Sequence, residues 1–359
     1  MAHPWTSDAG DATARGAVRV GRGTIVRAVV IAALLAFVLF ALPSILSVYW
    51  IGILTATAIY TIVALGLNVL FGRVGLVSLG QAALLAIGAW IAARFFFLTA
   101  LPFPIILLIA GVLTGAIGVV VGLPALRLGG LDLALITLML AGAISIVLTQ
   151  INFPNGGPGV LGHTETSSGT AAIRRPSIAG SDTAYYRYAV IVAAVMFLLA
   201  LVHVATKSGR AWAAIRQSEP AALAAGVNIT LYKLWAFALA SFMTGVAGGL
   251  LAAYAGHLYP ISVGLPIDSL TLLAVVLMGG IFSLWGAVVA GLLAQLLPAI
   301  LNSFNVSVYW AYILFGVGVL QVLATAPEGI VHQLPRDLAK LGRLLFATGR
   351  RVVAGGRAA

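Results

Sequence analysis

The residues best suited to chemistry lie in one polar stretch, residues 208–228, between two long apolar runs. Its charged side chains are Arg210, Arg216 and Glu219. The two arginines are six positions apart, so they do not share one face of a straight helix. We therefore expect one arginine to contact a partner and the other to meet a lipid phosphate or to hold the stretch in place. These groups favour docking over catalysis.

The same stretch predicts two short helices, the first over residues 210–217. Ser218 can cap the second helix, Pro220 fits its first turn, and Gly226 can end it in the left-handed conformation. Ala224 belongs to a small-sided apolar stripe suited to docking in a cleft, with Ala221, Leu223 and Ala225. The alternative interpretation is an ordinary loop.

No motif for catalysis or metal binding is present in the chain. It lacks the nucleotide-binding pattern Gly-x-x-x-x-Gly-Lys-Ser/Thr and the zinc-protease pattern His-Glu-x-x-His. Its five histidines are scattered, and the absence of cysteine excludes disulfides and thiolate metal sites. We expect a protein that is not an enzyme, with no catalytic residue, no metal site and no cofactor bound by this chain.

Four isolated polar residues in or beside the apolar runs could line a path for a solute: Asn68, Ser78, Gln81 and Thr137. The alternative for each is a hydrogen bond between packed helices. Acidic residues are nearly absent from the runs, since Asp132 and Asp268 fall at their ends. A carrier driven by protons or sodium usually keeps a carboxylate inside the bundle, so ion coupling is disfavoured.

The composition places these residues in a membrane protein. Hydrophobic residues make up 62% of the chain and charged residues 8%, with a mean hydropathy of +1.11. Soluble domains carry roughly 25% charged residues. Spanning segments must be helices or strands of a closed barrel, and barrel strands alternate apolar with polar residues. The apolar runs here are continuous, which predicts an all-α, polytopic transmembrane helical bundle.

The positions of Lys and Arg predict the topology, because they concentrate in cytoplasmic loops. Seven spans are expected near residues 28–48, 51–71, 81–100, 104–123, 131–151, 187–206 and 234–255. Two or three more fit between Asp268 and Glu328, and three place the basic C-terminal tail inside. The prediction is about ten spans with both termini cytoplasmic. The formal charge of +11 then reflects this rule rather than nucleic-acid binding.

This topology divides the chain into three parts. A cytoplasmic basic tail (1–27) precedes a transmembrane domain (28–327), and a second cytoplasmic basic tail (328–359) follows. The domain includes an extracytoplasmic loop (152–186) and a cytoplasmic loop (207–233). Two similar runs, residues 77–80 and 282–286, fall at predicted cytoplasmic junctions between spans, where both can be Gly-Ser turns.

Several motifs resemble those of one transporter family. The stretch ALGLNVLFGRVGLVSLGQAA, residues 64–83, looks like the signature of branched-chain amino-acid ABC permeases. Four further stretches resemble the LivM-like subunit: LPALRLGGL (123–131), NGGPGV (155–160), GRAWAAIR (209–216) with the later Ala-Gly (225–226), and MGGIFSLWG (278–286). The resemblance covers about residues 45–330, and the motifs stand in the family's order.

The resemblance implies an importer subunit in a bacterial inner membrane. Its partners would be a second, LivH-like permease, two ATP-binding subunits that use the ATP, an extracytoplasmic solute-binding protein and membrane lipid. Residues 208–228 then match the coupling helices that dock on the ATPases. The chain departs from the family at Gln81, Asp132 and Ala143. Urea or short amides therefore stay open as alternative substrates, and a secondary transporter is the alternative of another class.

Overall fold

The computed structural model describes residues 22–126, 130–150, 175–176, 179–256, 266–307, 309–325, 329–331 and 333. Within these residues every regular element is a helix, which confirms the predicted all-α class. The chain divides into two compact units, residues 1–47 and 48–359. Most of both predicted tails and of the predicted extracytoplasmic loop lies outside the described residues.

The first unit is one apolar helical stretch in three pieces. It consists of α1 (Arg22–Ala36), the π-helix η1 (Phe37–Ala41) and α2 (Leu42–Ile45). Its large apolar side chains are exposed, Phe40 to 66% and Ile45 to 73%. A helix with apolar side chains exposed in this way suits contact with lipid.

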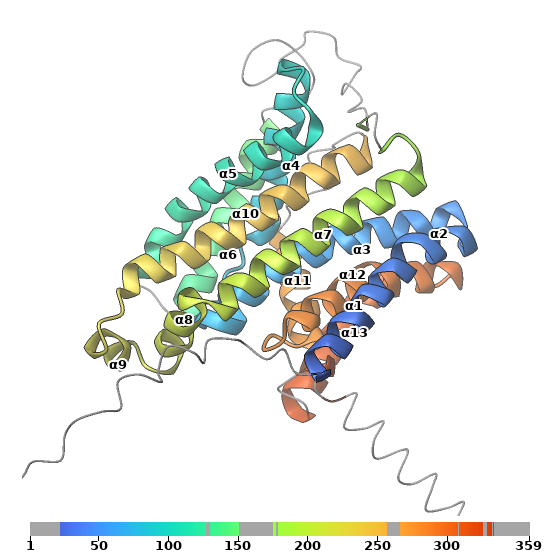
Figure 1. Ribbon diagram of the computed structural model, residues 1–359. Coiled ribbons are helices and arrows are strands. Elements are labelled where there is room, and N and C mark those ends of the chain that lie inside the picture. The colour runs from blue at the N-terminus through green and yellow to red at the C-terminus, as the bar shows by residue number, and fades with distance from the viewer. Residues whose placement is uncertain are drawn as a thin grey trace, which may run out of the picture. The chain divides into compact units, whose positions relative to one another are not determined.

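The second unit holds the other helices (Figure 1). In chain order they are α3 (Val48–Leu67), the π-helix η2 (Asn68–Val74), α4 (Gln81–Leu98), α5 (Phe103–Gly122), the 3-10 helix η3 (Leu123–Leu126), α6 (Gly130–Gln150), α7 (Asp182–Ala205), α8 (Lys207–Gln217), α9 (Glu219–Ala224), α10 (Ile229–Ala255), α11 (Pro266–Gly279), α12 (Leu284–Ser303) and α13 (Tyr309–Thr325). Local signals set several of their ends. Ser181 caps α7, Asn228 caps α10, and Gly75 ends η2 at a positive φ of 86°.

The described residues contain six helices long and apolar enough to cross a membrane. Four shorter apolar helices accompany them, at residues 29–45, 132–148, 266–279 and 309–322. Together these ten segments correspond to the predicted spans. One of them is short, since the 14 residues of α11 reach about 21 Å at 1.5 Å per residue. The hydrocarbon core is about 30 Å thick, so α11 alone does not cross it.

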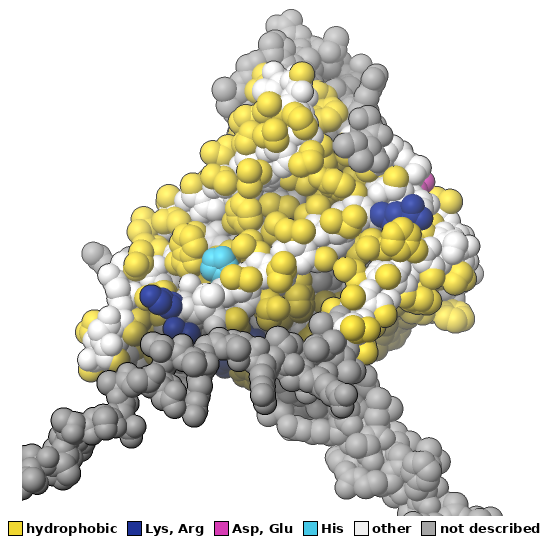
Figure 2. Space-filling model, in the orientation of Figure 1, with side chains coloured by type: hydrophobic (Ala, Val, Ile, Leu, Met, Phe, Trp, Pro, Cys, Tyr) yellow, Lys and Arg dark blue, Asp and Glu magenta, His cyan; other side chains and the backbone are white. Residues whose placement is uncertain are grey.

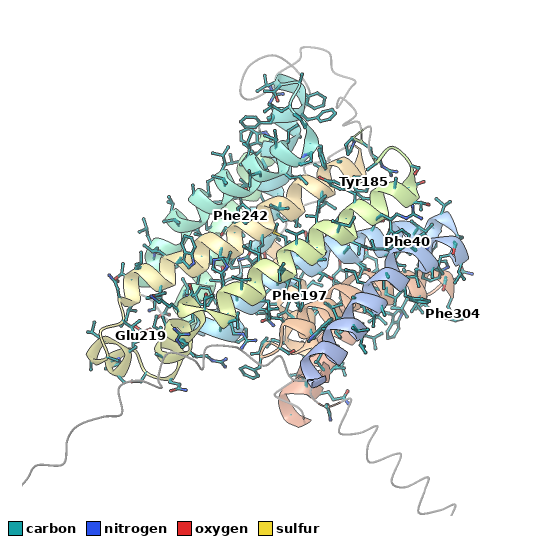
Figure 3. All side chains as sticks on the ribbon, in the orientation of Figure 1. Phe40, Tyr185, Phe197, Glu219, Phe242 and Phe304 are labelled. Carbon is teal, nitrogen blue, oxygen red and sulfur yellow. The ribbon has the colours of Figure 1, made fainter. Side chains whose placement is uncertain are left out.

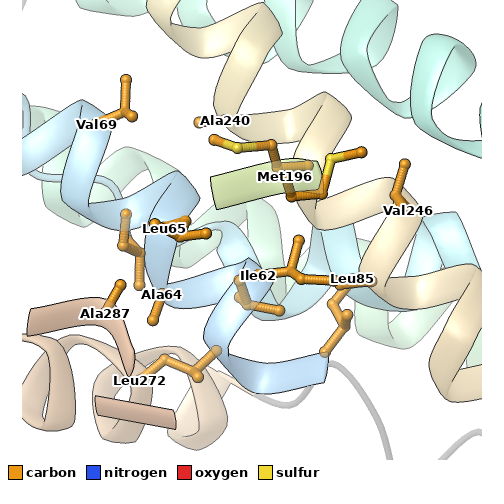
Figure 4. Close-up of a cluster of buried hydrophobic side chains, with 14 of the residues drawn as sticks. Ile62, Ala64, Leu65, Val69, Leu85, Met196, Ala240, Val246, Leu272 and Ala287 are labelled. Carbon is orange, nitrogen blue, oxygen red and sulfur yellow. The ribbon is translucent and has the colours of Figure 1, made fainter. Parts of the chain in front are cut away.

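Helix α10 forms the centre of the second unit and packs most closely on α5, α4 and α3 (Figure 1). Small residues allow this approach, as is usual between helices in membranes. A Cβ atom added to Gly88 of α4 would lie 2.5 Å from the Cα of Gly245 on α10. Around this crossing lies a buried apolar cluster with members on every α-helix from α3 to α13, including Ile62, Leu85, Met196 and Leu272 (Figure 4).

The outer surface is apolar as well. On the face drawn in Figure 2, hydrophobic side chains cover much of the helices, and Lys and Arg side chains are few. Leu108 on α5, Val195 on α7 and Leu320 on α13 are each more than half exposed. Exposure of this apolar surface to water would be unfavourable, whereas its contact with lipid is favourable.

Several turns meet at one end of the second unit. A Cβ on Gly72 would lie 1.8 Å from the carbonyl oxygen of Ile281, and one on Gly329 would lie 2.2 Å from the Cα of Gly280. The end of η2, the turn between α11 and α12, and Gly329 therefore share this end. Figure 3 places Glu219 of α9 toward this end and Tyr185 of α7 toward the opposite one.

This arrangement agrees with three spans after Asp268, and it generates a topology prediction. A reporter fused after Gly180 should lie on the opposite side of the membrane from one fused after Ala359. Alkaline phosphatase should be active only at the first site, and green fluorescent protein should fluoresce only at the second. Finding both fusions on the same side would contradict the ten-span topology.

Candidate functional site

The α8 helix is held against the start of α10 by an indole. Trp212 is fully buried, and its Nε1–H donates a hydrogen bond to the carbonyl oxygen of Tyr232 at 2.9 Å. Ala211 and Ile215 are buried beside it, so α8 has one apolar face turned inward. The helix begins at Lys207, slightly before the predicted start.

Arg216 links α8 to two other parts of the bundle. Its guanidinium donates a hydrogen bond to the carbonyl oxygen of Gly72 at the end of η2. The same group lies 4.4 Å from the ring centroid of Phe282, in the turn before α12, within the range of a cation–π contact. Partial desolvation lowers the pKa of Arg216 from its usual value, yet arginine stays charged in proteins.

The two arginines of the stretch therefore have different surroundings. Arg216 holds the stretch in place, one of the two roles expected for an arginine here. Arg210 is exposed on α8. The contact of Arg210 with a partner remains a prediction.

The α9 helix has the predicted ends. The hydroxyl of Ser218 accepts a hydrogen bond from the N–H of Ala221, and Pro220 lies in the first turn. Gly226 has a φ of +80°, and its N–H bonds to Leu223 O at 2.9 Å while that of Val227 bonds to Ala222 O at 3.0 Å. These two bonds are the Schellman pattern that a left-handed residue permits.

The apolar stripe of α9 faces outward. Leu223 is 64% exposed, and Ala221, Ala224 and Ala225 are also exposed. Only Ala222 of this helix is buried, and it fixes α9 to the bundle. The stripe proposed for docking is thus available to a partner.

Glu219, a further residue predicted to dock, has a partner within the chain. Its Oε1 lies 2.8 Å from Nζ of Lys233 on α10, whose side chain is 5% exposed while that of Glu219 is 50% exposed. The carboxylate compensates a charge that is almost buried. Glu219 therefore anchors α9 on α10. The ion pair with Lys233 accounts for a carboxylate at this position without a contact with an ATPase.

Of the predicted path residues, Asn68 stands apart from the others. It is fully buried, and its Nδ2 donates to the carbonyl oxygens of Ser283 at 2.9 Å and Gly280 at 3.3 Å. It thus ties the start of η2 to the turn between α11 and α12. This is the alternative role, a hydrogen bond between packed elements.

The other three, Ser78, Gln81 and Thr137, meet at the first turn of α4. Thr137 on α6 accepts a hydrogen bond from the N–H of Leu79 at 2.9 Å, and Ser78 accepts one from the N–H of Gly80 at 3.4 Å. Gln81 accepts one from Thr244 on α10 at 2.7 Å. All three residues are buried, and lining of a path by any of them remains a prediction.

Two members of this group were not predicted from the sequence. Thr244 contacts Gln81, and Ser269 on α11 accepts a hydrogen bond from the N–H of Ala82 at 3.3 Å. Each is a hydroxyl residue in an apolar span, and the sequence carries no further signal for its role.

The position of α4 also corrects an expectation. Residues 77–80 were expected to form a turn at a cytoplasmic junction. They instead lie in a mostly buried segment without regular secondary structure, residues 75–80, that leads into the bundle. Gln81 bonds to Thr244, near the middle of α10, so α4 begins inside the bundle rather than at its end.

These features define a multi-pass membrane protein that carries an extramembrane helical pair and a buried helix start. Residues 49–323 match the family described as "Branched-chain amino acid transport system / permease component", and the chain belongs to this family. It is an ABC-type permease subunit.

Curated relatives agree with this family. The high-affinity branched-chain amino acid transport system permease proteins LivM of Salmonella typhimurium and Escherichia coli are each 30% identical over 308 residues. These matches cover 78% of this chain and 69% of each relative. The ribose import permease protein RbsC of Haemophilus influenzae is 26% identical over 270 residues, which cover 73% of this chain and 80% of RbsC. No solved structure matches the chain.

The buried indole generates a stability prediction. Trp212→Ala should destabilise the protein by about 3–5 kcal/mol, the usual range for a large aromatic in a core. Trp212→Phe keeps most of the packing and loses one hydrogen bond, so its cost should be about 1 kcal/mol. Melting temperatures of the purified permease should follow this order.

The matched control is Trp235→Ala, because Trp235 is 47% exposed on α10. It should lower the melting temperature less than Trp212→Ala does. Equal losses from both alanine variants would contradict the anchoring role of Trp212.

Proposed function

We propose that the chain is the permease subunit of an ATP-driven importer for branched-chain or related amino acids. The single observation that carries this proposal is the 30% identity to LivM over most of the chain. The absence of a nucleotide-binding motif fits a chain whose ATP is hydrolysed on separate subunits. The other partners would be a second permease of the LivH type and an extracytoplasmic solute-binding protein.

In this proposal the α8–α9 pair docks on an ATPase subunit. The exposed stripe of α9 with Ala224, and the exposed Arg210, form the contact surface. Trp212, the Glu219–Lys233 ion pair and Arg216 hold the pair to the bundle. A displacement of the pair would then reach Gly72 and Phe282, which are the contacts of Arg216.

The orientation follows from the same docking. ATP-binding subunits are cytoplasmic, so α8 and α9 lie at the cytoplasmic surface of the inner membrane. Gly329 meets Gly280 at the end where Arg216 contacts Gly72. This contact and the ten-span count support the proposal that both termini are cytoplasmic.

Among the alternatives, a permease for urea or short amides shares the family and differs only in solute. A secondary transporter would move solute without partners. No side chain in the described part of the chain specifically indicates a secondary transporter.

Partner dependence separates these classes. The purified chain alone in liposomes should neither hydrolyse ATP nor take up L-leucine, because it lacks a nucleotide site. The same chain assembled with its ATPase and permease partners and given the binding protein should do both. Uptake by the lone chain driven by a solute gradient would favour the secondary transporter.

The docking surface can be tested by substitution. Ala224→Arg places a large charged side chain on the exposed stripe and should abolish solute-stimulated ATP hydrolysis by the complex. Gly226→Val should do the same, because a β-branched residue at positive φ costs roughly 1–2 kcal/mol. No atom lies within 4 Å of a Cβ at this position, so backbone strain alone would cause the loss.

Two controls make the result specific. Ala100→Arg adds the same side chain at an exposed alanine between α4 and α5 and should leave hydrolysis intact. Gly226→Asn should retain activity, since asparagine tolerates the left-handed region. Normal stimulation in both Ala224→Arg and Gly226→Val, with normal assembly, would show that residues 208–228 are an ordinary loop.

A further inference from the structure

Five buried polar side chains surround the first turn of α4. None of them is more than 2% exposed, and they come from α4, the segment before it, α6, α10 and α11: Gln81, Ser78, Thr137, Thr244 and Ser269. Helix α3 completes the group, since a Cβ on its Gly66 would lie 3.2 Å from Oγ1 of Thr244. Helices distant in sequence thus converge on the start of α4.

The amide of Gln81 has hydrogen-bonding capacity to spare. Its Oε1 accepts from Thr244 Oγ1 at 2.7 Å, and Nε2 has no partner among the described residues. If the amide were turned over, Nε2 could donate to Thr244, but one of its two N–H groups would still be left. Gln81 is 1% exposed, and a buried donor without a partner is costly. Either orientation therefore leaves a donor to offer to a ligand.

The N-terminus of α4 lies at the same place and also attracts negative charge. Helix α4 has 18 residues, and its N-cap residue, Gly80, has no side chain, while Ser269 of α11 accepts only from the N–H of Ala82 in the first turn. A helix N-terminus carries partial positive charge and attracts anionic groups, and within apolar surroundings this attraction is screened little. The unpartnered amide and the helix end therefore both favour a negative group.

The proposed function narrows the class of ligand. An amino acid is a zwitterion, so it offers a carboxylate to Gln81 and the helix end while it carries no net charge.

We propose that Gln81 and the N-terminus of α4 bind the carboxylate of a zwitterionic amino acid as it passes through the bundle. This inference rests on the proposed function and specifies where the path recognises its solute. It favours amino acids over urea or short amides, because these neutral solutes bring no carboxylate to the helix end.

The test uses the full transporter, with its partner subunits and binding protein, in proteoliposomes supplied with ATP. Gln81→Glu places a like charge against the carboxylate and should lower the initial rate of L-leucine uptake about tenfold or more. Gln81→Leu removes the donor and should lower it severalfold. Gln81→His keeps an N–H donor and should stay within about twofold of the original rate.

Ser241→Ala is the matched control. Ser241 is also a buried hydroxyl without a partner on α10, but it packs near Gly118 of α5 and not at the start of α4. Its uptake should equal that of the unaltered chain. A loss as large as that of Gln81→Leu would overturn the inference, because it would mean that any polar deletion in the bundle blocks transport.

A binding measurement supports the case independently of uptake rates, since the chain has no native cysteine. Gln81→Cys should react with a small thiol reagent during turnover, and excess L-leucine should slow that reaction. Absence of reaction in every nucleotide state, or reaction that L-leucine does not slow, would overturn the inference.

The outcomes separate this inference from the proposed function. If L-leucine uptake is unchanged in Gln81→Glu and Gln81→Leu, the carboxylate site is wrong and the amino-acid permease stands. If the unaltered complex imports urea and not L-leucine, the carboxylate site is wrong and the ATP-driven permease stands. If the assembled complex imports no solute with ATP, both are wrong.

Discussion

The structure depends on how the protein satisfies backbone polar groups inside an apolar bundle. Segment 75–80 is mostly buried and has no regular secondary structure, so its N–H groups lack the repeating partners that a helix provides. In lipid or an apolar core, each unpaired group costs several kcal/mol. Thr137 and Ser78 supply acceptors for this segment, and Ser269 supplies one for the first turn of α4. Thr137 and Ser269 thus satisfy backbone groups of other segments from within otherwise apolar helices.

The same constraint gives the molecule a point at which movement can be transmitted. Irregular backbone moves more easily than a continuous helix, and segment 75–80 directly follows η2. Arg216 bonds to the carbonyl oxygen of Gly72 near the end of η2 and lies on the ring of Phe282 in the turn before α12. The extramembrane helices are therefore joined to two interruptions in the spans by one side chain. Asn68 joins those interruptions to each other.

The sequence predicts the local features of this arrangement well. Charge spacing separates ten apolar segments, and Ser218, Pro220 and Gly226 predict the limits of α9 because caps and left-handed ends depend on neighbouring residues. It does not predict that α4 starts inside the bundle. A Gly-Ser run is compatible both with a surface turn and with an irregular buried segment, and only packing decides between them. Thr244 lies 163 positions from Gln81, and no local pattern announces that contact. The pairing of Glu219 with Lys233 is also missed, because it depends on how α9 folds back on α10.

In the proposed function, Arg216 transmits motion from the α8–α9 pair to the spans through its contacts with Gly72 and Phe282. The most direct test measures the number of L-leucine molecules imported per ATP hydrolysed by the reconstituted complex that carries Arg216→Gln. The account predicts that the variant still assembles with the ATPase subunits and that this ratio falls severalfold. An unchanged ratio, with import and hydrolysis falling together or not at all, would contradict it.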